Sequence, residues 1–159
     1  MPLTLTHTKN KYENVEPSSI TSAVSSIEQN VSSNNGKLTS LESGLLSNEE
    51  IWKASAKTPL QTAFTKLTGE VTTEITEALE KAKTVATNVE EYKTNWEAAS
   101  AAVKEYNSLE AEHDTSGTPA TNPNYKDNSA AMKVQKDIYD EKDPAYQAND
   151  TTIQGIVGG

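Results

Sequence analysis

The stretch LQTAFTKLTGEVTTEITEALEKAKTVATNVEEYKTNWEAASAAVKEYNSLEAEH, residues 60–113, decides the fold. Its apolar residues follow one another at steps of three or four, which places them on one face of an α-helix. This stripe consists of Leu60, Phe64, Leu67, Val71, Ile75, Leu79, Ala82, Val85, Val89, Tyr92, Trp96, Ala99, Val103 and Tyr106. The sequence therefore predicts one long helix that begins between residues 48 and 59, with 55–59 as the first choice, and runs to about His113, where the run DTSGTP stops it.

A second apolar stripe precedes this one and predicts a helix over residues 18–46. Its members are Ile20, Val24, Ile27, Val31, Leu38, Leu41 and Leu45. Asn34-Asn35-Gly36 falls where an apolar residue is missing, which would fit a kink, a bulge or a break. Most of the other positions are Ser, Thr, Asn and Gln, and Ser and Thr are weak helix formers. This helix should therefore depend on burying its stripe.

The connection between the two stripes is short, so the helices should lie antiparallel. One hairpin cannot enclose a core, and its remaining apolar edge should attract a second hairpin. The expected fold is all-α: an antiparallel helical hairpin over residues 18–113 that completes a four-helix bundle on dimerisation. The residues expected to bind the partner are Leu67, Val71, Ile75, Leu79, Val89 and Trp96.

The flanking regions lack a comparable stripe. Residues 1–17 are expected to be a flexible arm with a brief extended start at Leu3 and Leu5, and simple disorder is the alternative. Residues 114–159 are expected to be a mostly disordered tail that contains a short helix over residues 129–142.

Composition narrows the class of protein. The chain has 159 residues, no Cys, a net charge of −9 and only 34% hydrophobic residues. Disulfides and thiolate zinc sites are excluded. Nucleic-acid binding is not expected, because the chain has no Arg and an excess of acidic residues. The sequence offers no apolar run for membrane insertion and no basic start followed by an apolar region, so no cleavable signal peptide is expected.

Enzymatic motifs are absent from the sequence. His7 and His113 are far apart, and no nucleophile elbow, zinc-protease, P-loop or dinucleotide pattern occurs. The acidic cluster at residues 137–143 is better explained by a solvated turn than by a metal site. The sequence predicts no catalytic residue, no cofactor and no metal ligand.

A small acidic helical hairpin with Trp between its helices resembles the WXG100 superfamily of type VII secretion substrates and partners. The family's W-x-G motif falls on Trp52-Lys53-Ala54, with Ala54 in place of the family's Gly. Ala56 and Phe64 are similar to the small and aromatic residues that open the family's second helix. The resemblance covers residues 18–113.

The resemblance also implies an export signal of the form Y-x-x-x-D/E near the end of the second helix. Tyr106 and Glu110 match it in type and place, and residues four apart share one helix face. The same spacing recurs at Tyr12–Glu16, Tyr139–Asp143 and Tyr146–Asp150, so four of the six Tyr fit. Tyr106/Glu110 is the first choice by position, and Tyr139/Asp143 is the second.

Together, the resemblance implies a protein that pairs with another helical hairpin or with the N-terminal helical domain of a toxin. It would be exported with that partner, or target it, through a secretion ATPase, without a cleavable signal peptide. The alternative is a coiled-coil structural or adaptor protein, for example in a phage or surface assembly, that forms a homo-oligomeric bundle. In that case the Tyr spacings would be accidental.

Overall fold

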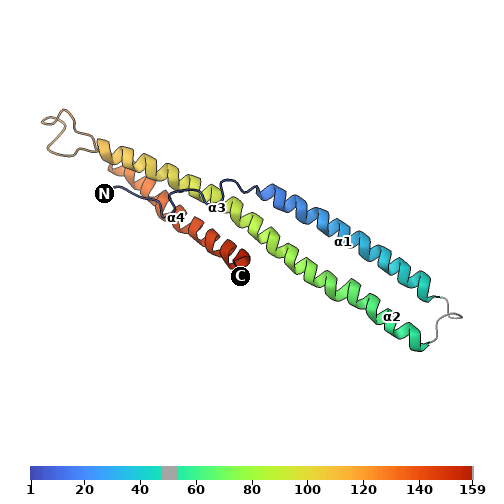
Figure 1. The fold of residues 1–159 in the computed structure, drawn as a ribbon. Helices are drawn as coiled ribbons and strands as arrows, with labels where there is room; N and C mark the ends of the chain where they lie inside the picture. Colours follow the sequence, from blue (N-terminus) through green and yellow to red (C-terminus); the bar gives the residue numbers. More distant parts are fainter. Residues whose placement is uncertain (48–53, 159) are drawn as a thin grey trace. The chain divides into compact units, whose positions relative to one another are not determined.

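A computed structural model describes residues 1–47 and 54–158. The described residues form helices and connecting segments and no strand, which confirms the all-α prediction. The elements are α1 (Pro17–Leu46), α2 (Ala54–Lys66), the π-helical stretch η1 (Leu67–Val71), α3 (Thr72–Glu112) and α4 (Ser129–Val157) (Figure 1). The chain divides into two compact units. We call Glu16–Ala86 the hairpin unit, and Met1–Val15 together with Thr87–Gly159 the terminal unit.

In the hairpin unit, α1 lies antiparallel to α2, η1 and the first part of α3. Glu28 pairs with Lys83 at 2.7 Å, and the side-chain amide of Asn35 donates to the Thr72 hydroxyl at 2.8 Å. The later residue of α1 thus meets the earlier residue of α3, so the two helices run in opposite directions. This arrangement is compatible with the predicted hairpin. The predicted helix over residues 18–46 is confirmed, and α1 continues without a break through the Asn-Asn-Gly run at residues 34–36.

The polar composition of α1 is accommodated by hydrogen bonds from side chain to backbone. The Thr21 hydroxyl donates to the Pro17 carbonyl at 3.1 Å, and the Ser40 hydroxyl donates to the Gly36 carbonyl at 3.0 Å. Such bonds satisfy the hydroxyl on the helix surface without requiring another partner. They do not supply a driving force, so the helix still depends on its packing.

The second long helical region is interrupted by a local change of pitch that the sequence did not predict. Leu67–Val71 adopts π-helical geometry between α2 and α3, and α3 ends at Glu112, one residue before the predicted His113. A wider turn of this kind occurs mostly as a single turn inside an α-helix, frequently at functional sites. Hydroxyls of Thr68 and Thr73 donate to the carbonyls of Phe64 and Gly69 and add bonds across this stretch.

In the terminal unit, α4 corrects the expected disordered tail. It is 29 residues long and continues through Pro144, whereas the sequence predicts a short helix over residues 129–142. The buried residues of α4 are Asp143, Tyr146, Asn149, Asp150 and Ile153, all of which lie beyond the predicted end. The tertiary contacts of α4 after residue 142 therefore outweigh the local cost of a proline inside the helix.

The N-terminal segment, residues 1–15, corrects the expected flexible arm. It forms neither helix nor strand, but it lies against α3 and α4 (Figure 1). Leu3, Leu5 and His7 are half-buried, whereas the threonines between them are exposed. This alternation is that of an extended chain with one face against a surface, and it agrees with the brief extended start expected at Leu3 and Leu5.

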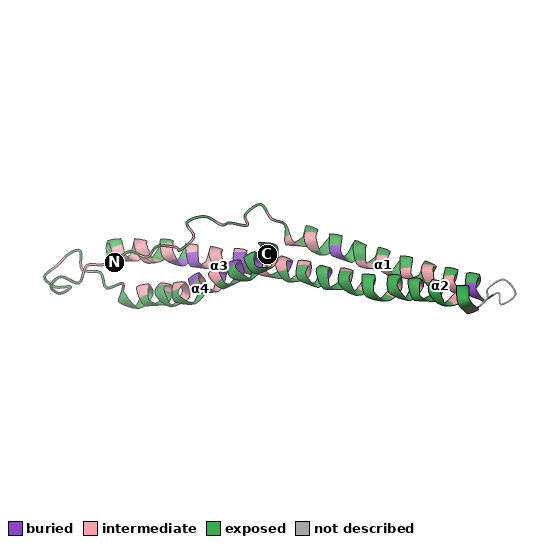
Figure 2. Ribbon diagram, turned by 60° about the horizontal axis from the view of Figure 1, so that its bottom comes forward, coloured by how far each residue is buried: buried purple, intermediate pink, exposed green. Residues whose placement is uncertain are grey.

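The core of the terminal unit joins three parts of the chain. Tyr92, Ala99 and Tyr146 are buried together, and Leu5, Tyr12 and Trp96 pack against them. Figure 2 shows buried residues gathered in the later half of α4 and the facing part of α3, whereas α1 is mostly exposed. The terminal unit thus covers its own apolar ridge with segments from both ends of the chain.

Candidate interaction surfaces

Side chains of α3 and α4 bind the backbone of the N-terminal segment. The side-chain amide of Asn107 accepts from the Leu3 amide at 2.8 Å and donates to the Leu3 carbonyl at 3.0 Å. The His7 amide donates to the Tyr146 hydroxyl at 3.1 Å, and the His7 carbonyl accepts from the Trp96 indole at 2.9 Å. These bonds satisfy backbone groups that have no partner in a helix or sheet.

Asp143 binds the middle of the segment from α4. Its carboxylate accepts from the Thr6 amide at 3.1 Å and from the Thr6 hydroxyl at 2.7 Å, and also from Tyr146 and Gln147. Burial disfavours the charged carboxylate, but the hydrogen bonds from Tyr146, Thr6 and Gln147 outweigh burial and lower the pKa of Asp143. The carboxylate is therefore held ionised inside the terminal unit.

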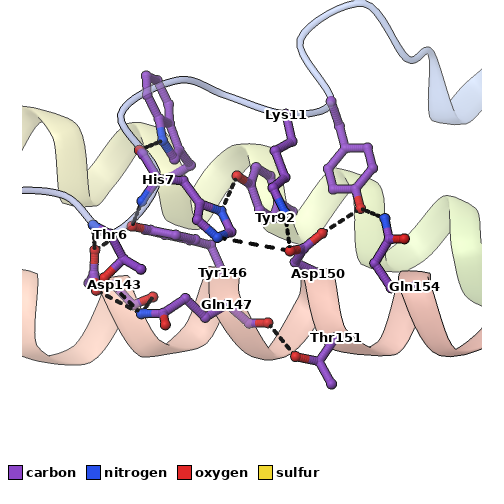
Figure 3. Close-up of polar contacts among 12 residues, drawn as sticks. Thr6, His7, Lys11, Tyr92, Asp143, Tyr146, Gln147, Asp150, Thr151 and Gln154 are labelled. Atoms are coloured by element: carbon purple, nitrogen blue, oxygen red, sulfur yellow. Dashed lines mark hydrogen bonds and ion pairs between the residues drawn. The ribbon is translucent and has the colours of Figure 1, made fainter.

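Asp150, two helical turns further along α4, binds the second part of the segment (Figure 3). It accepts from Lys11 at 2.5 Å and from the Tyr12 hydroxyl at 2.6 Å, and His7 Nε2 lies 3.9 Å away. Burial again opposes ionisation, but the bonds from Lys11 and Tyr12 lower the pKa of Asp150. The two aspartates thus hold the segment at two places through charge-assisted hydrogen bonds.

The aromatic rings between these aspartates form a packed cluster. Tyr12 and Tyr92 meet edge to face with ring centroids 4.9 Å apart, and Tyr92 and Tyr146 do so at 5.4 Å. The His7 ring nitrogen Nδ1 lies 2.8 Å from the Tyr92 hydroxyl. Burial, with the hydrogen bond to an aspartate as the next cause, raises the pKa of Tyr12 and of Tyr146 to about 12. The rings therefore stay neutral and act as packing and hydrogen-bonding groups.

The buried polar side chains of the described residues are paired. No buried side-chain nitrogen or oxygen among the described residues lacks a hydrogen-bond partner. In the same part of the chain, no group of three or more His, Asp or Glu is placed to hold a metal ion. No described helix is long and apolar enough to cross a membrane.

The hairpin unit carries a different surface, which is apolar and exposed. The large apolar residues exposed there are Ile27, Leu41, Leu45, Leu67 and Val71. Leu41 and Leu67 are 56% and 47% exposed. Ile27, Leu41 and Leu45 share one face of α1 by helical spacing, and Leu67 and Val71 lie in η1. We call these five residues the exposed apolar set.

A hollow of about 420 Å³ lies between α1 and α3 in the same unit. Its apolar lining comes from Val31 on α1 and from Ile75 and Leu79 on α3. Leu79 is buried and Ile75 is half-buried, so these two side chains belong partly to the internal packing of the hairpin.

The six residues predicted to bind a partner are divided between the two units. Leu67 and Val71 are exposed in the hairpin unit. Val89 is buried in the terminal unit, and the Trp96 indole is bound to the His7 carbonyl. For Val89 and Trp96 the expected role is corrected, because the chain's own packing covers the ridge at that point.

The predicted motif residues also differ in their surroundings. Tyr106 and Glu110 lie half-buried on α3, and the Glu110 carboxylate pairs with the Met1 amine. Tyr139 donates to the Thr4 carbonyl at 2.8 Å, and Asp143 is buried against Thr6. Trp52 and Lys53 of the turn motif lie outside the described residues, and so does the side chain of Ala54, which begins α2.

Sequence reasoning missed the binding of the N-terminal segment, although two signals for it were present. One is the alternation of Leu and His with Thr at residues 3–8. The other is the Tyr–Asp spacing at Tyr139–Asp143 and Tyr146–Asp150, all four of which contact the segment or its ring cluster. Contacts with the N-terminal segment therefore explain two of the four copies of the Y-x-x-x-D/E spacing.

Comparison of the chain with protein-family models, curated proteins and solved structures gives no match.

Proposed function

We propose that this protein is a WXG100-like partner protein that pairs through its hairpin unit with another helical hairpin. The partner would be a second small protein or the N-terminal helical domain of a larger secreted toxin, and both would leave the cell through a type VII secretion ATPase without a cleavable signal peptide. The single observation that supports pairing is the exposed apolar set of the hairpin unit. The class of protein, WXG100-like, is inferred from the resemblance of residues 18–113 to that superfamily.

Apolar side chains that stay in water leave hydrophobic free energy unused. Full burial of a Leu, Ile or Val side chain contributes about 1.5–3 kcal/mol, so the five half-exposed side chains forgo several kcal/mol in the isolated chain. A partner hairpin that covers both α1 and η1 would recover this free energy and complete a four-helix bundle.

The experiment is pairing of the full chain with the products of neighbouring genes after co-expression. Leu67→Asp should reduce co-purification at least tenfold, because pairing would bury an unpaired carboxylate. The stability of the isolated chain should change by less than about 0.5 kcal/mol, since Leu67 is exposed. Ile75→Asp should also abolish pairing, but its side chain lines the hollow, so Leu67→Asp is the cleaner variant.

Thr65→Asp is the matched control, because Thr65 is exposed two residues away on the same helical region. The control should pair like the unmodified chain. Normal co-purification of Leu67→Asp with the partner would contradict the proposal. A stable homotrimer or larger assembly of the isolated chain would instead favour the alternative, a coiled-coil structural or adaptor protein.

A further inference from the structure

The contacts of the N-terminal segment suggest more than a folded terminus, because they recognise its backbone. Seven backbone groups of the segment are bound by side chains of α3 or α4: Leu3 N and O, Thr4 O, Thr6 N, His7 N and O, and Val15 O. Peptide-binding proteins likewise use hydrogen bonds to the main chain of the peptide for affinity and contacts to its side chains for specificity.

Side-chain contacts add selectivity to this backbone recognition. Leu5 and Tyr12 pack against the buried cluster, and Lys11 and Tyr12 bind Asp150. The segment is basic before residue 13, with Lys9 and Lys11, whereas the α4 groups that it meets are acidic. Shape, hydrogen bonding and charge therefore favour the same ligand: a peptide that is extended at two aliphatic residues two positions apart and then turns at a Lys-Tyr pair.

All these binding groups come from residues 92–154. We call them the segment-binding surface: Tyr92, Lys93, Trp96, Asn107, Tyr139, Asp143, Tyr146, Gln147, Asp150 and Gln154. Only Val15 O lies at the connection at residues 15–16, where it accepts from Lys93, and the other six bound backbone groups lie at residues 3–7. A peptide that is not joined to the surface can therefore make the same bonds.

We infer that the segment-binding surface is a peptide-binding site, and that the N-terminal segment of a second copy can occupy it in place of the chain's own segment. Exchange of an identical element between copies preserves every contact and is a low-cost route to association. The chain's own segment competes at the high effective concentration of a short tether, on the order of millimolar. Exchange therefore grows when the in-chain segment is weakened or the protein is concentrated.

The experiment uses a fluorescent peptide of residues 1–15 as the probe and the full chain as the receptor. The unmodified chain should bind the peptide weakly and saturably, because the peptide must displace the chain's own segment. A chain carrying Leu5→Asp and Tyr12→Ala keeps the segment-binding surface but loosens its own segment. We expect it to bind the peptide at least tenfold more tightly.

Two controls define the site. Adding Asp150→Asn to the loosened chain should weaken peptide binding at least tenfold, because Asp150 accepts from both Lys11 and Tyr12. A peptide carrying Leu3→Asp, Leu5→Asp and Tyr12→Ala should not bind either chain. Equal binding of the two peptides would overturn the inference, and so would the absence of binding to a loosened chain that keeps its helical content.

If the loosened chain does not fold, peptide binding to the unmodified chain tests the inference. Saturable binding of the peptide at excess, with a change in Trp96 fluorescence in a Trp52→Phe background, supports the inference, whereas no binding overturns it. In addition, light scattering of the concentrated unmodified chain should detect a dimer that excess peptide dissociates. A dimer that the peptide leaves intact would mean that the copies associate through another surface. That result would overturn the inference that they exchange their N-terminal segments.

Discussion

At the scale of the residue, Asp150 shows how an acidic side chain becomes part of a core. The sequence contains 23 acidic residues, and nothing in its local pattern separates Asp150 from those on solvated faces. In the structure it is 9% exposed and is bound by Lys11 and Tyr12, which lie more than 130 positions earlier in the chain. Contacts so distant in sequence leave no periodic signal, so spacing alone does not reveal them.

The lowered pKa values of Asp143 and Asp150 predict an acid-sensitive terminal unit. A carboxyl whose pKa is lower in the folded state stabilises the fold above its unfolded pKa of about 3.9, and this contribution is lost as the pH falls through the folded pKa. Trp96 fluorescence, measured in a Trp52→Phe background, should therefore be constant from neutral pH to about 5 and change below about 4.

The variant Asp150→Asn tests the origin of this acid sensitivity. It should cost about 1–3 kcal/mol at neutral pH, because Lys11 and Tyr12 lose a charged acceptor, and it should make the stability of the unit less dependent on pH below about 4. Asp137→Asn is the control, because Asp137 is an exposed partner of Lys133. An unchanged acid response in Asp150→Asn would show that this carboxylate does not hold the segment.

The proposed export signal also belongs to the residue scale. Tyr106→Ala should block secretion of the protein from a bacterium with a type VII system while leaving its complex with the partner intact. Tyr125→Ala is a matched control, because the residue four positions after Tyr125 is Ser129 rather than an acid. Secretion assays with both variants check this, and normal secretion of Tyr106→Ala would remove this pair as the signal.

At the scale of the element, the spacing of apolar residues predicted α1 and the end of α3 to within a residue or so, because both helices follow apolar stripes. It failed for α4, whose buried face contains Asp143 and Asp150 as well as Tyr146 and Ile153. A stripe of mixed polarity is not distinguishable from a solvated face by hydropathy alone. Pro144 reinforced the error, because the residue before a proline usually leaves the helical conformation.

Truncation after Lys142 tests α4 as a structural element. Removing residues 143–159 should lower helical content, measured by circular dichroism, by more than the lost residues contribute, since Tyr92 and Trp96 would lose their covering. Trp96 fluorescence should change at the same time. Removing only residues 158–159 is the control and should leave both signals unchanged. A loss limited to the helix that was deleted would show that α4 does not support the rest of the terminal unit.

At the scale of the whole molecule, the two units differ in how far they bury their apolar residues. The terminal unit covers the ridge of α3 with α4 and the N-terminal segment, and Val89, Tyr92, Tyr146 and Ile153 are fully buried in it. The hairpin unit keeps its exposed apolar set in water, and its α1 is rich in weak helix formers. The sequence predicts a single ridge in need of a partner. The terminal unit covers its part of that ridge itself, and for the hairpin unit the need of a partner stays a prediction.

Amide hydrogen–deuterium exchange of the isolated full chain tests this division most directly. Each tenfold difference in protection corresponds to about 1.4 kcal/mol of local opening free energy. We expect residues 89–109 and 143–153 to exchange at least tenfold more slowly than residues 17–46 and 54–75, with the change falling inside α3 near Ala86. Equal protection of the two units would contradict the account, because the hairpin would then be stable without a partner.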